Sequence, residues 1–222
     1  MDQPTKSPRR PASGPQQRRA LQTRADLLAV TETLVAAEGC EAVTTTRVAA
    51  ESGVAVGTIY RYFHNREALL LAAYDDTVER IGRSCIDHLA DMEPMLEPQA
   101  AINSLIDCYL AAAESIPAHA SLLREMQHLR PVAEDRAKDD GDVATSILMP
   151  FLRRYGIGNA NLGPGHLLVV YTLMATLVDL YLITEDAETR ANIRADLQAY
   201  ALFAFSRLQK QRPRKTSGAL LD

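Results

Sequence analysis

The stretch TTTRVAAESGVAVGTIYRYFHNREALL, residues 44–70, decides the fold of this chain. It predicts two short helices around a glycine turn, followed at once by a third helix that Asn65 caps. Gly53 supplies the backbone freedom that a tight corner between two helices needs. The second helix, over about Val56–Tyr62, then stands at the corner as a short and accessible element. This arrangement suits a helix that enters a groove of DNA.

The second short helix is predicted to have an apolar side and a polar side. Ile59 and Phe63 lie four residues apart, so both can pack inward. Tyr60 also fits the core of the head, because a tyrosine can bury its ring and still present its hydroxyl. The polar side offers hydroxyls, rings and positive charge to phosphates, from Thr58, Tyr60, Arg61, Tyr62 and His64.

This segment resembles the DNA-binding head of the tetracycline-repressor (TetR) family of bacterial transcription regulators. The matching pieces are Thr46–Ala49, Gly53–Val54, Gly57–Phe63 and Arg66–Leu70, and the similarity extends over about Arg24–Tyr74. The resemblance implies an all-α fold, in which a three-helix head is joined by a long helix to a larger helical domain. That larger domain would bind an effector and form a homodimer.

The resemblance also implies which residues bind DNA, with phosphate contacts from the threonines and tyrosines and a base contact from Arg47. Gly57 would let the backbone approach DNA closely. Ala55 departs from the family, which often has serine there; alanine cannot cap the helix, a loss of about 1 kcal/mol. The implied DNA-binding residues are Thr46, Arg47, Ala55, Val56, Gly57, Thr58, Tyr60, Arg61, Tyr62, His64 and Arg66.

The charge of the chain is unevenly distributed. The 222 residues carry a net charge of −4 and are 47% hydrophobic, which is enough for a head and one larger domain. Residues 1–24 hold six basic side chains and one acidic one, a net charge of +5 that leaves −9 for the remainder. A basic end on an acidic body directs DNA to that end.

Composition argues against several other classes of protein. Three cysteines without metal-type spacing do not fit a secreted disulfide framework, and Cys85 with His88 lacks companions for a metal site. Residues 1–22 have no apolar run of the signal-peptide kind. The longest apolar run, Leu167–Ile183, is too short and too interrupted to span a membrane. We therefore expect a cytoplasmic protein with no cofactor, no metal and no membrane partner.

Prolines and glycines divide the chain into four parts. These are a disordered basic arm (1–21), a helix-turn-helix domain (22–67), an effector-binding and dimerisation domain (68–212) and a flexible tail (213–222). Arginines of the arm either solubilise it or contact DNA. The acidic run 134–142 is predicted to be a solvated loop. Helices are predicted over 23–38, 65–92, 99–115, 117–129, 143–155 with a break near Pro150, 164–183 and 187–211.

The last helix is predicted to be apolar on two sides, since Leu202 and Phe203 lie off its main apolar stripe. One side can pack on the body and the other on a second copy, so the last two helices would form a four-helix bundle in a homodimer, as they do in the TetR family. The alternative is a monomer in which these helices are central to its own core. The stripe consists of Ile193, Leu197, Tyr200, Ala201, Ala204, Phe205 and Leu208.

By the same resemblance, the larger domain binds a small molecule that moves the two heads out of register with DNA. Asp179 is notable among the candidate contacts, because a carboxylate within an apolar run needs a partner. Each candidate is also compatible with an ordinary place in the core. The candidates are Tyr109, Met126, His128, Met149, Tyr171, Met174 and Asp179.

The predicted function is a repressor that binds a pseudo-palindromic operator as a homodimer and is released by a small molecule. A regulator with a protein effector, or with none, is an alternative, and these residues are compatible with activation as well. An all-helical enzyme is a further alternative. It is disfavoured because the sequence has no nucleophile elbow, His-Glu-x-x-His motif, phosphate loop or paired catalytic carboxylates.

Overall fold

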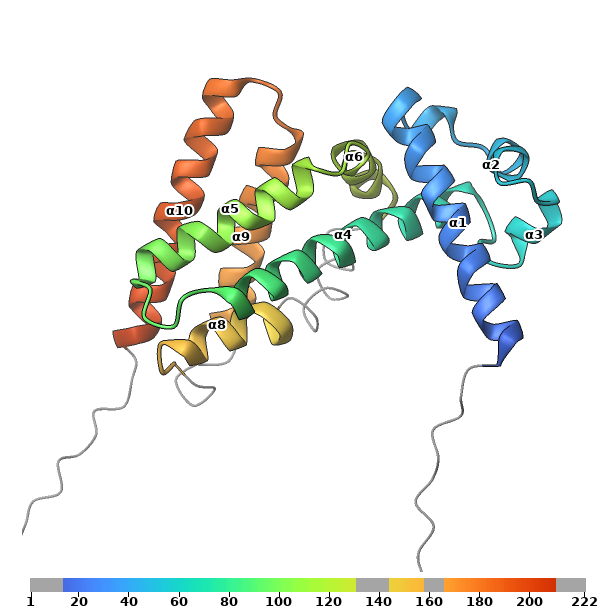
Figure 1. The fold of residues 1–222 in the computed structure, drawn as a ribbon. Helices are drawn as coiled ribbons and strands as arrows, with labels where there is room; N and C mark the ends of the chain where they lie inside the picture. Colours follow the sequence, from blue (N-terminus) through green and yellow to red (C-terminus); the bar gives the residue numbers. More distant parts are fainter. Residues whose placement is uncertain (1–13, 131–143, 158–165, 211–222) are drawn as a thin grey trace, which may run out of the picture.

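The computed structural model describes residues 14–130, 144–157 and 166–210, and every regular element within these ranges is helical. The helices form a small amino-terminal head and a larger body (Figure 1). One long helix, α4 (Arg66–Asp91), starts in the head and runs into the body. The architecture is therefore the all-α head and body that the sequence predicts.

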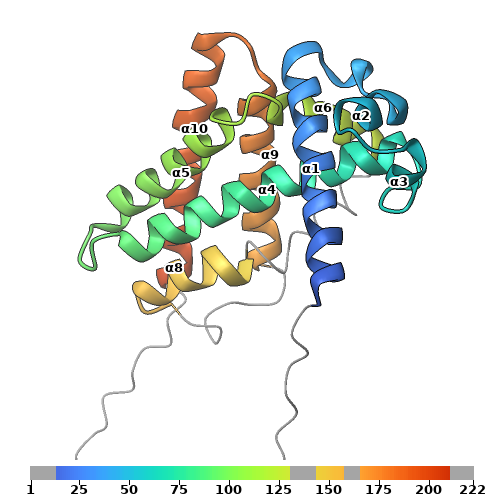
Figure 2. The ribbon, with the colours of Figure 1, turned by 45° about the vertical axis from the view of Figure 1, so that its right-hand side comes forward.

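The head consists of α1 (Pro15–Glu38), the 3-10 turn η1 (Cys40–Ala42), α2 (Thr45–Glu51) and α3 (Val56–Tyr60). Gly39, with φ of 83°, ends α1, and Gly53, with φ of 66°, forms the corner between α2 and α3. Both glycines adopt the positive φ that other residues avoid. Figure 2 shows α1 crossing α4, with α2 and α3 at the outer end of the molecule.

The first helix begins at Pro15, so its predicted start at Thr23 is wrong, as is the assignment of residues 15–21 to a disordered arm. Proline is well tolerated in the first turn of a helix, because its missing N–H would have no partner there. The residues that follow, Gln16–Leu21, are mostly good helix formers. Pro15 therefore starts the helix instead of preventing it.

The long helix α4 is capped and buried as predicted. Asn65 Oδ1 accepts a hydrogen bond from the backbone N–H of Ala68 at 2.7 Å. The sequence also predicts a stripe that faces the core, because six residues of this helix follow one another at spacings of three and four. All six are buried, namely Leu70, Tyr74, Thr77, Ile81, Cys85 and Leu89. Because this stripe is continuous, one rigid element connects the head to the body.

Within the described ranges, the body contains five further helices and one short π-helical segment. Helix α6 packs against α4 and also contacts α1 and η1, so it lies between head and body. Near Pro150 the helix type changes at Met149, and the proline occupies the first turn of the new helix, which agrees with the predicted break. The elements are α5 (Pro98–Glu114), α6 (His119–Leu129), η2 (Ala144–Leu148), α8 (Met149–Arg154), α9 (His166–Ile183) and α10 (Ala187–Lys210).

Helices α9 and α10 pack against each other and expose large apolar side chains on their outer surface. On α10, Phe205 is buried while Phe203 is 58% exposed, so this helix has the two apolar sides that its sequence predicts. None of the helices in the described ranges is both long and apolar enough to cross a bilayer. The exposed large apolar residues of α9 are Leu168, Val169, Leu173 and Leu180.

Several predictions lie outside the described residues. They are the disorder of residues 1–13, the acidic loop 134–142, the first two residues of the helix predicted over 164–183, and the tail 213–222.

Candidate nucleic-acid interface

The short helix α3 is held by its apolar side. Ile59 and Phe63 are buried, as predicted from their spacing. Ala55 is the N-cap residue of α3 and makes no side-chain cap hydrogen bond, which the sequence also predicts. Helix α3 is thus held by packing of Ile59 and by the glycine corner before it, and not by a cap.

The opposite side of α3 faces solvent. The Tyr60 side chain is 54% exposed, which excludes the alternative that it belongs to the core. Its hydroxyl lies within hydrogen-bond distance, 3.3 Å, of Thr45 Oγ1, and this contact holds the ring against the amino end of α2. Thr46, Ala55, Gly57, Arg61 and His64 are likewise exposed, whereas Arg47, Val56, Thr58, Tyr62 and Arg66 are partly buried.

Gly57 leaves the centre of this surface open. A Cβ atom built at this position would meet no atom within 4 Å in the protein. Its φ lies outside the positive range, so the glycine is not required by the conformation of its own backbone. The structure of the protein alone therefore gives no reason for a glycine here.

Arg47 is engaged by carboxylates of the head. Its backbone N–H donates to Thr44 Oγ1 at 3.1 Å, which caps α2. Its guanidinium donates to Glu38 Oε2 at 2.9 Å through Nη1 and to Glu51 Oε1 at 3.2 Å through Nε. The hydrogen bond from Arg47 lowers the pKa of Glu38. All three side chains are at least a third exposed, and exposed ion pairs typically contribute at most about 1 kcal/mol, so the carboxylates hold Arg47 only weakly.

Arg66 points into the protein, in contrast to the phosphate contact that the resemblance implies. Its Nε donates to the carbonyl oxygen of Val43 at 2.9 Å, and its Nη2 to that of Cys40 at 2.8 Å. Nη1 forms an ion pair with Glu125 of α6 at 3.2 Å. All three acceptors are distant in sequence, and together they occupy the guanidinium. In this structure the Arg66 side chain links α4, on which it lies, to η1 and to α6.

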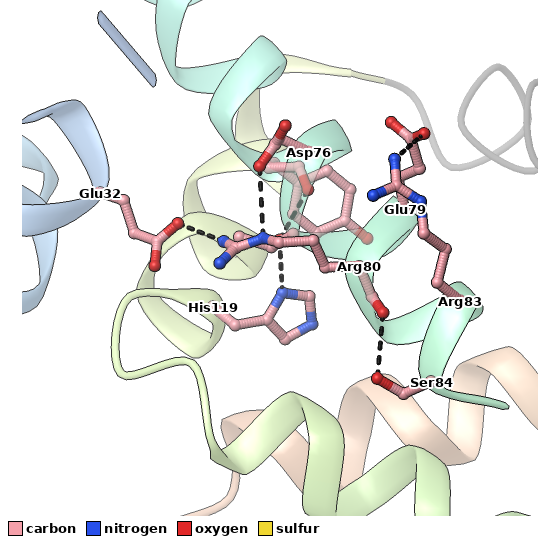
Figure 3. A network of polar contacts seen from close by, with 9 residues as sticks. Glu32, Asp76, Glu79, Arg80, Arg83, Ser84 and His119 are labelled. Carbon is pink, nitrogen blue, oxygen red and sulfur yellow. Dashed lines mark hydrogen bonds and ion pairs between the residues drawn. The ribbon is translucent and has the colours of Figure 1, made fainter. Parts of the chain in front are cut away.

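A second ion pair crosses from head to body. Arg80 of α4 binds Glu32 of α1 through Nη2, and its Nε lies 3.3 Å from Asp76 Oδ2 (Figure 3). Below this arginine, the buried His119 of α6 faces α4 and contacts Thr77 Oγ1 through Nδ1 at 2.7 Å. With the Arg66–Glu125 pair, two charged contacts therefore hold the head at its angle to the body.

A basic groove flanks α3. Arg61 and Tyr62, just after α3, line a hollow of about 600 Å³ together with Arg19 and Thr23 of α1. Arg24 lies over the Phe63 ring at 5.7 Å from its centroid. The sequence points to arginines of this segment as possible DNA contacts but assigns Arg19 to a disordered arm. Arg19 could have been placed on a helix only by using the rule that a proline, here Pro15, is favourable in the first turn of a helix.

The seven predicted effector contacts are dispersed through the body. Met126 and Met149 are core residues, and Tyr109 and Met174 are partly buried against the same core. Tyr171 is buried, Asp179 is partly buried, and His128 is exposed. Two hollows lined by described residues, the basic groove and one between α4 and α5, contain none of the seven.

Comparison with known proteins gives a family match for the head. Residues 27–73 match the model of the family described as bacterial regulatory proteins, tetR family. No curated protein matches the chain. The matched segment runs from the first buried leucine of α1 to the second turn of α4, so it contains the whole of α2 and α3.

Solved structures match most of the chain at low sequence identity. A TetR transcriptional regulator from Rhodococcus sp. RHA1 is 19% identical, with a TM-score of 0.60 over 85% of this chain and 97% of that one. A TetR-family regulator from Streptomyces coelicolor is 18% identical, with a TM-score of 0.58 over 82% and 99%. The regulator RolR, solved in complex with resorcinol, is 18% identical, with a TM-score of 0.61 over 88% and 96%. The fold of head and body together is therefore that of the TetR regulators.

Proposed function

We propose that this chain, which has the TetR match in its head and the TetR fold along its length, is a transcriptional regulator that binds operator DNA. The observation that carries the proposal is the surface of α3. Tyr60, Arg61 and His64 face solvent there, while Ile59 holds the same helix from behind. A helix that is apolar inside and rich in donors outside, at the exposed end of the molecule, is built to contact another molecule.

The residues divide into two roles in this proposal. Ala55, Val56 and Gly57 form the front of α3 and enter the major groove, where the lack of a side chain at Gly57 lets the backbone approach the bases. Phosphates are bound by Thr46, Thr58, Tyr60, Tyr62 and Arg61. Arg61 lines the basic groove together with Arg19. Arg47 reads a base after leaving Glu38 and Glu51. Arg66 acts indirectly, by fixing the connection between α1 and α2 on which the DNA surface rests.

The proposed active form is a homodimer joined through α9 and α10. On α9, Val169, Leu173, Thr176 and Leu180 are exposed and follow one another at spacings of four, three and four, which puts them on one face. Phe203 of α10 adds a ring that is 58% exposed. A monomer rarely leaves a continuous apolar surface of this kind uncovered. Two copies related by a two-fold axis would then present their α3 helices to adjacent major grooves of a pseudo-palindromic operator.

We further propose that a small molecule in the body controls the heads, and that repression is the default effect, because a bound operator obstructs polymerase. RolR, which shares the fold, is solved with resorcinol. The proposed domains are the helix-turn-helix head, 22–67, and the effector and dimer domain, 68–212, with residues 1–21 and 213–222 at the ends. We expect the regulator to act in the cytoplasm. A protein effector, or none, is the second candidate.

The decisive experiment is a binding titration with DNA from upstream of the gene itself, followed by fluorescence anisotropy at fixed ionic strength. Tyr60→Ala should weaken binding about tenfold, as expected for loss of one phosphate contact near the groove. Met95→Ala is the matched control, because Met95 is 90% exposed in the connection between α4 and α5, far along the chain from α3. Wild-type protein that shows no preference for any duplex would refute the proposal and reopen the enzyme alternative.

Addition of metabolite extracts to the preformed complex then separates the effector hypotheses. Release of DNA by a fraction of low molecular mass supports a small-molecule effector. Release only by a macromolecular fraction, or no release, supports the second candidate.

A further inference from the structure

Helices α4 and α5 form an antiparallel pair whose register is set by two polar contacts. The helices lie side by side in both views (Figure 1, Figure 2). His88 Nε2 on α4 lies 2.8 Å from Ser104 Oγ on α5. One turn earlier on α4 and one turn later on α5, the thiol of Cys108 donates to the carbonyl oxygen of Ser84 at 3.7 Å. This register puts Cys108 directly against the segment that carries Cys85.

The two thiols differ in their access to solvent. Cys85 is 1% exposed, whereas Cys108 is partly exposed and lines an open hollow of about 770 Å³ between α4 and α5. Burial, and then the neighbouring Cys108 thiol, raise the pKa of Cys85 to about 12. Cys85 therefore stays protonated, and a dissolved reagent meets Cys108 first.

The third cysteine provides an internal comparison. Cys40 lies on η1 in the head, where its thiol donates to the carbonyl oxygen of Ser121 at 3.5 Å. It is buried, and burial raises its pKa to about 11. Cys40 thus shares the burial of Cys85 but has a carbonyl oxygen beside its thiol, where Cys85 has a second thiol.

We propose that Cys108 and Cys85 form a dithiol site that hydrogen peroxide oxidises to a disulfide between α5 and α4. In the first step the Cys108 thiolate attacks the peroxide, the O–O bond breaks, and a sulfenic acid and one water molecule form once the leaving oxygen has taken a proton. In the second step the Cys85 sulfur attacks the Cys108 sulfur, its thiol proton passes to the leaving hydroxide, and a second water is released. Two thiols are oxidised and one peroxide is reduced.

The consequence of this disulfide for gene regulation rests on the proposed function. Helix α4 carries the head, and α5 packs against α10 as well as against α4. A covalent link between α4 and α5 fixes the position of α4 within the body. Because allosteric couplings between two sites typically change affinity by 5–150-fold, operator affinity should change at least about fivefold on oxidation.

Peptide mapping of the full-length protein after hydrogen peroxide treatment tests the site. Both thiols fall in one tryptic peptide, residues 84–124, which has no lysine or arginine between Ser84 and Arg124. Disulfide formation removes two hydrogen atoms from this peptide. Cleavage on the amino side of Asp87 and Asp107 should leave the two cysteine fragments joined until a reductant is added.

Three variants make the mapping specific. Cys40→Ser should form the disulfide as wild type does, whereas Cys108→Ser should retain all its remaining thiols. In Cys85→Ser, the sulfenic acid on Cys108 should persist and be trapped by dimedone. Oxidation of Cys108 to a sulfinic acid while Cys85 stays reduced, or loss of the Cys40 thiol before the other two, would overturn the site.

The regulatory consequence has its own readout. Anisotropy titrations with reduced and oxidised wild-type protein should differ at least about fivefold in operator affinity, and Cys108→Ser should abolish the difference. Equal affinities for reduced and fully crosslinked protein would refute the regulatory role. Absence of operator binding by reduced protein would instead contradict the proposed function, while the peptide map still decides whether the disulfide forms.

Discussion

Protonation of His119 should destabilise this protein in mild acid. The ring is 2% exposed, stacks on Tyr74 with centroids 5.7 Å apart, and contacts Thr77 Oγ1 through Nδ1 at 2.7 Å. The single hydroxyl proton of Thr77 is donated to the Tyr74 carbonyl oxygen at 2.6 Å, so Nδ1 of His119 must carry the proton that it shares with Thr77. A second proton would create a buried cation next to Arg80 (Figure 3).

Burial, and then the charge of Arg80, lower the pKa of His119 from 6.5 to about 4. Between these two pH values His119 is protonated in the unfolded chain but stays neutral in the folded chain. The free energy of unfolding therefore falls as the pH falls. At about 1.4 kcal/mol per pH unit, the full effect is about 3 kcal/mol. This destabilisation is absent above pH 6.5. By pH 4.5 it should have lowered the free energy of unfolding by about 2 kcal/mol.

Urea unfolding followed by circular dichroism, at one protein concentration between pH 7 and pH 4.5, measures this effect. His119→Phe keeps a ring against Tyr74 and removes the titrating group. Between pH 7 and pH 4.5 its free energy of unfolding should therefore fall by about 2 kcal/mol less than that of the wild type. His64→Gln, at an exposed position in the head, should retain the wild-type slope. Parallel stability curves for wild type and His119→Phe would show that the buried ring is not the source of the acid sensitivity.

Three further substitutions test the cap, the Arg66 link and the dimer. Asn65→Ala removes the Oδ1 that accepts from Ala68 and should lower the free energy of unfolding by about 1 kcal/mol in a denaturant titration. Arg66→Lys keeps the charge but cannot reach Val43, Cys40 and Glu125 together, so it should cost about 2 kcal/mol; a loss of DNA affinity at unchanged stability would instead favour a phosphate contact. Leu173→Glu should give monomers in sedimentation experiments, because it buries a charge in the proposed interface. Ile86→Glu on α4 is the control and should leave the assembly intact, since Ile86 is 40% exposed and Leu173 is 42% exposed.

The sequence predicted best those features that depend on neighbouring residues. The Asn65 cap, the glycine corner at Gly53 and the stripe of α4 all follow from local spacing, and the structure confirms each of them. The observed start of α1 differs from the sequence prediction for a local reason, because a proline such as Pro15 disrupts the interior of a helix. The same residue is favourable in a first turn.

Features that depend on packing between distant segments could not be predicted. Arg66 matches a family position by sequence, but its acceptors lie 23, 26 and 59 residues away, and only the packed head and α6 bring them together. Cys85 and Cys108 likewise follow no spacing along one helix. They meet because the hairpin of α4 and α5 has a particular register, which depends on the length and shape of the connection between the helices.

In the proposed DNA-binding function, the open space around Gly57 would separate folding from DNA recognition in a way that genetics can use. Since nothing in the protein lies within 4 Å of an added Cβ, alanine at this position should leave the chain free to fold. If regulators assemble as dimers, each mixed pair then has one obstructed reading helix. A cell that expresses both alleles would lose regulation although it still makes intact protein, so substitutions at this position should behave as dominant, whereas substitutions that unfold the head should be recessive.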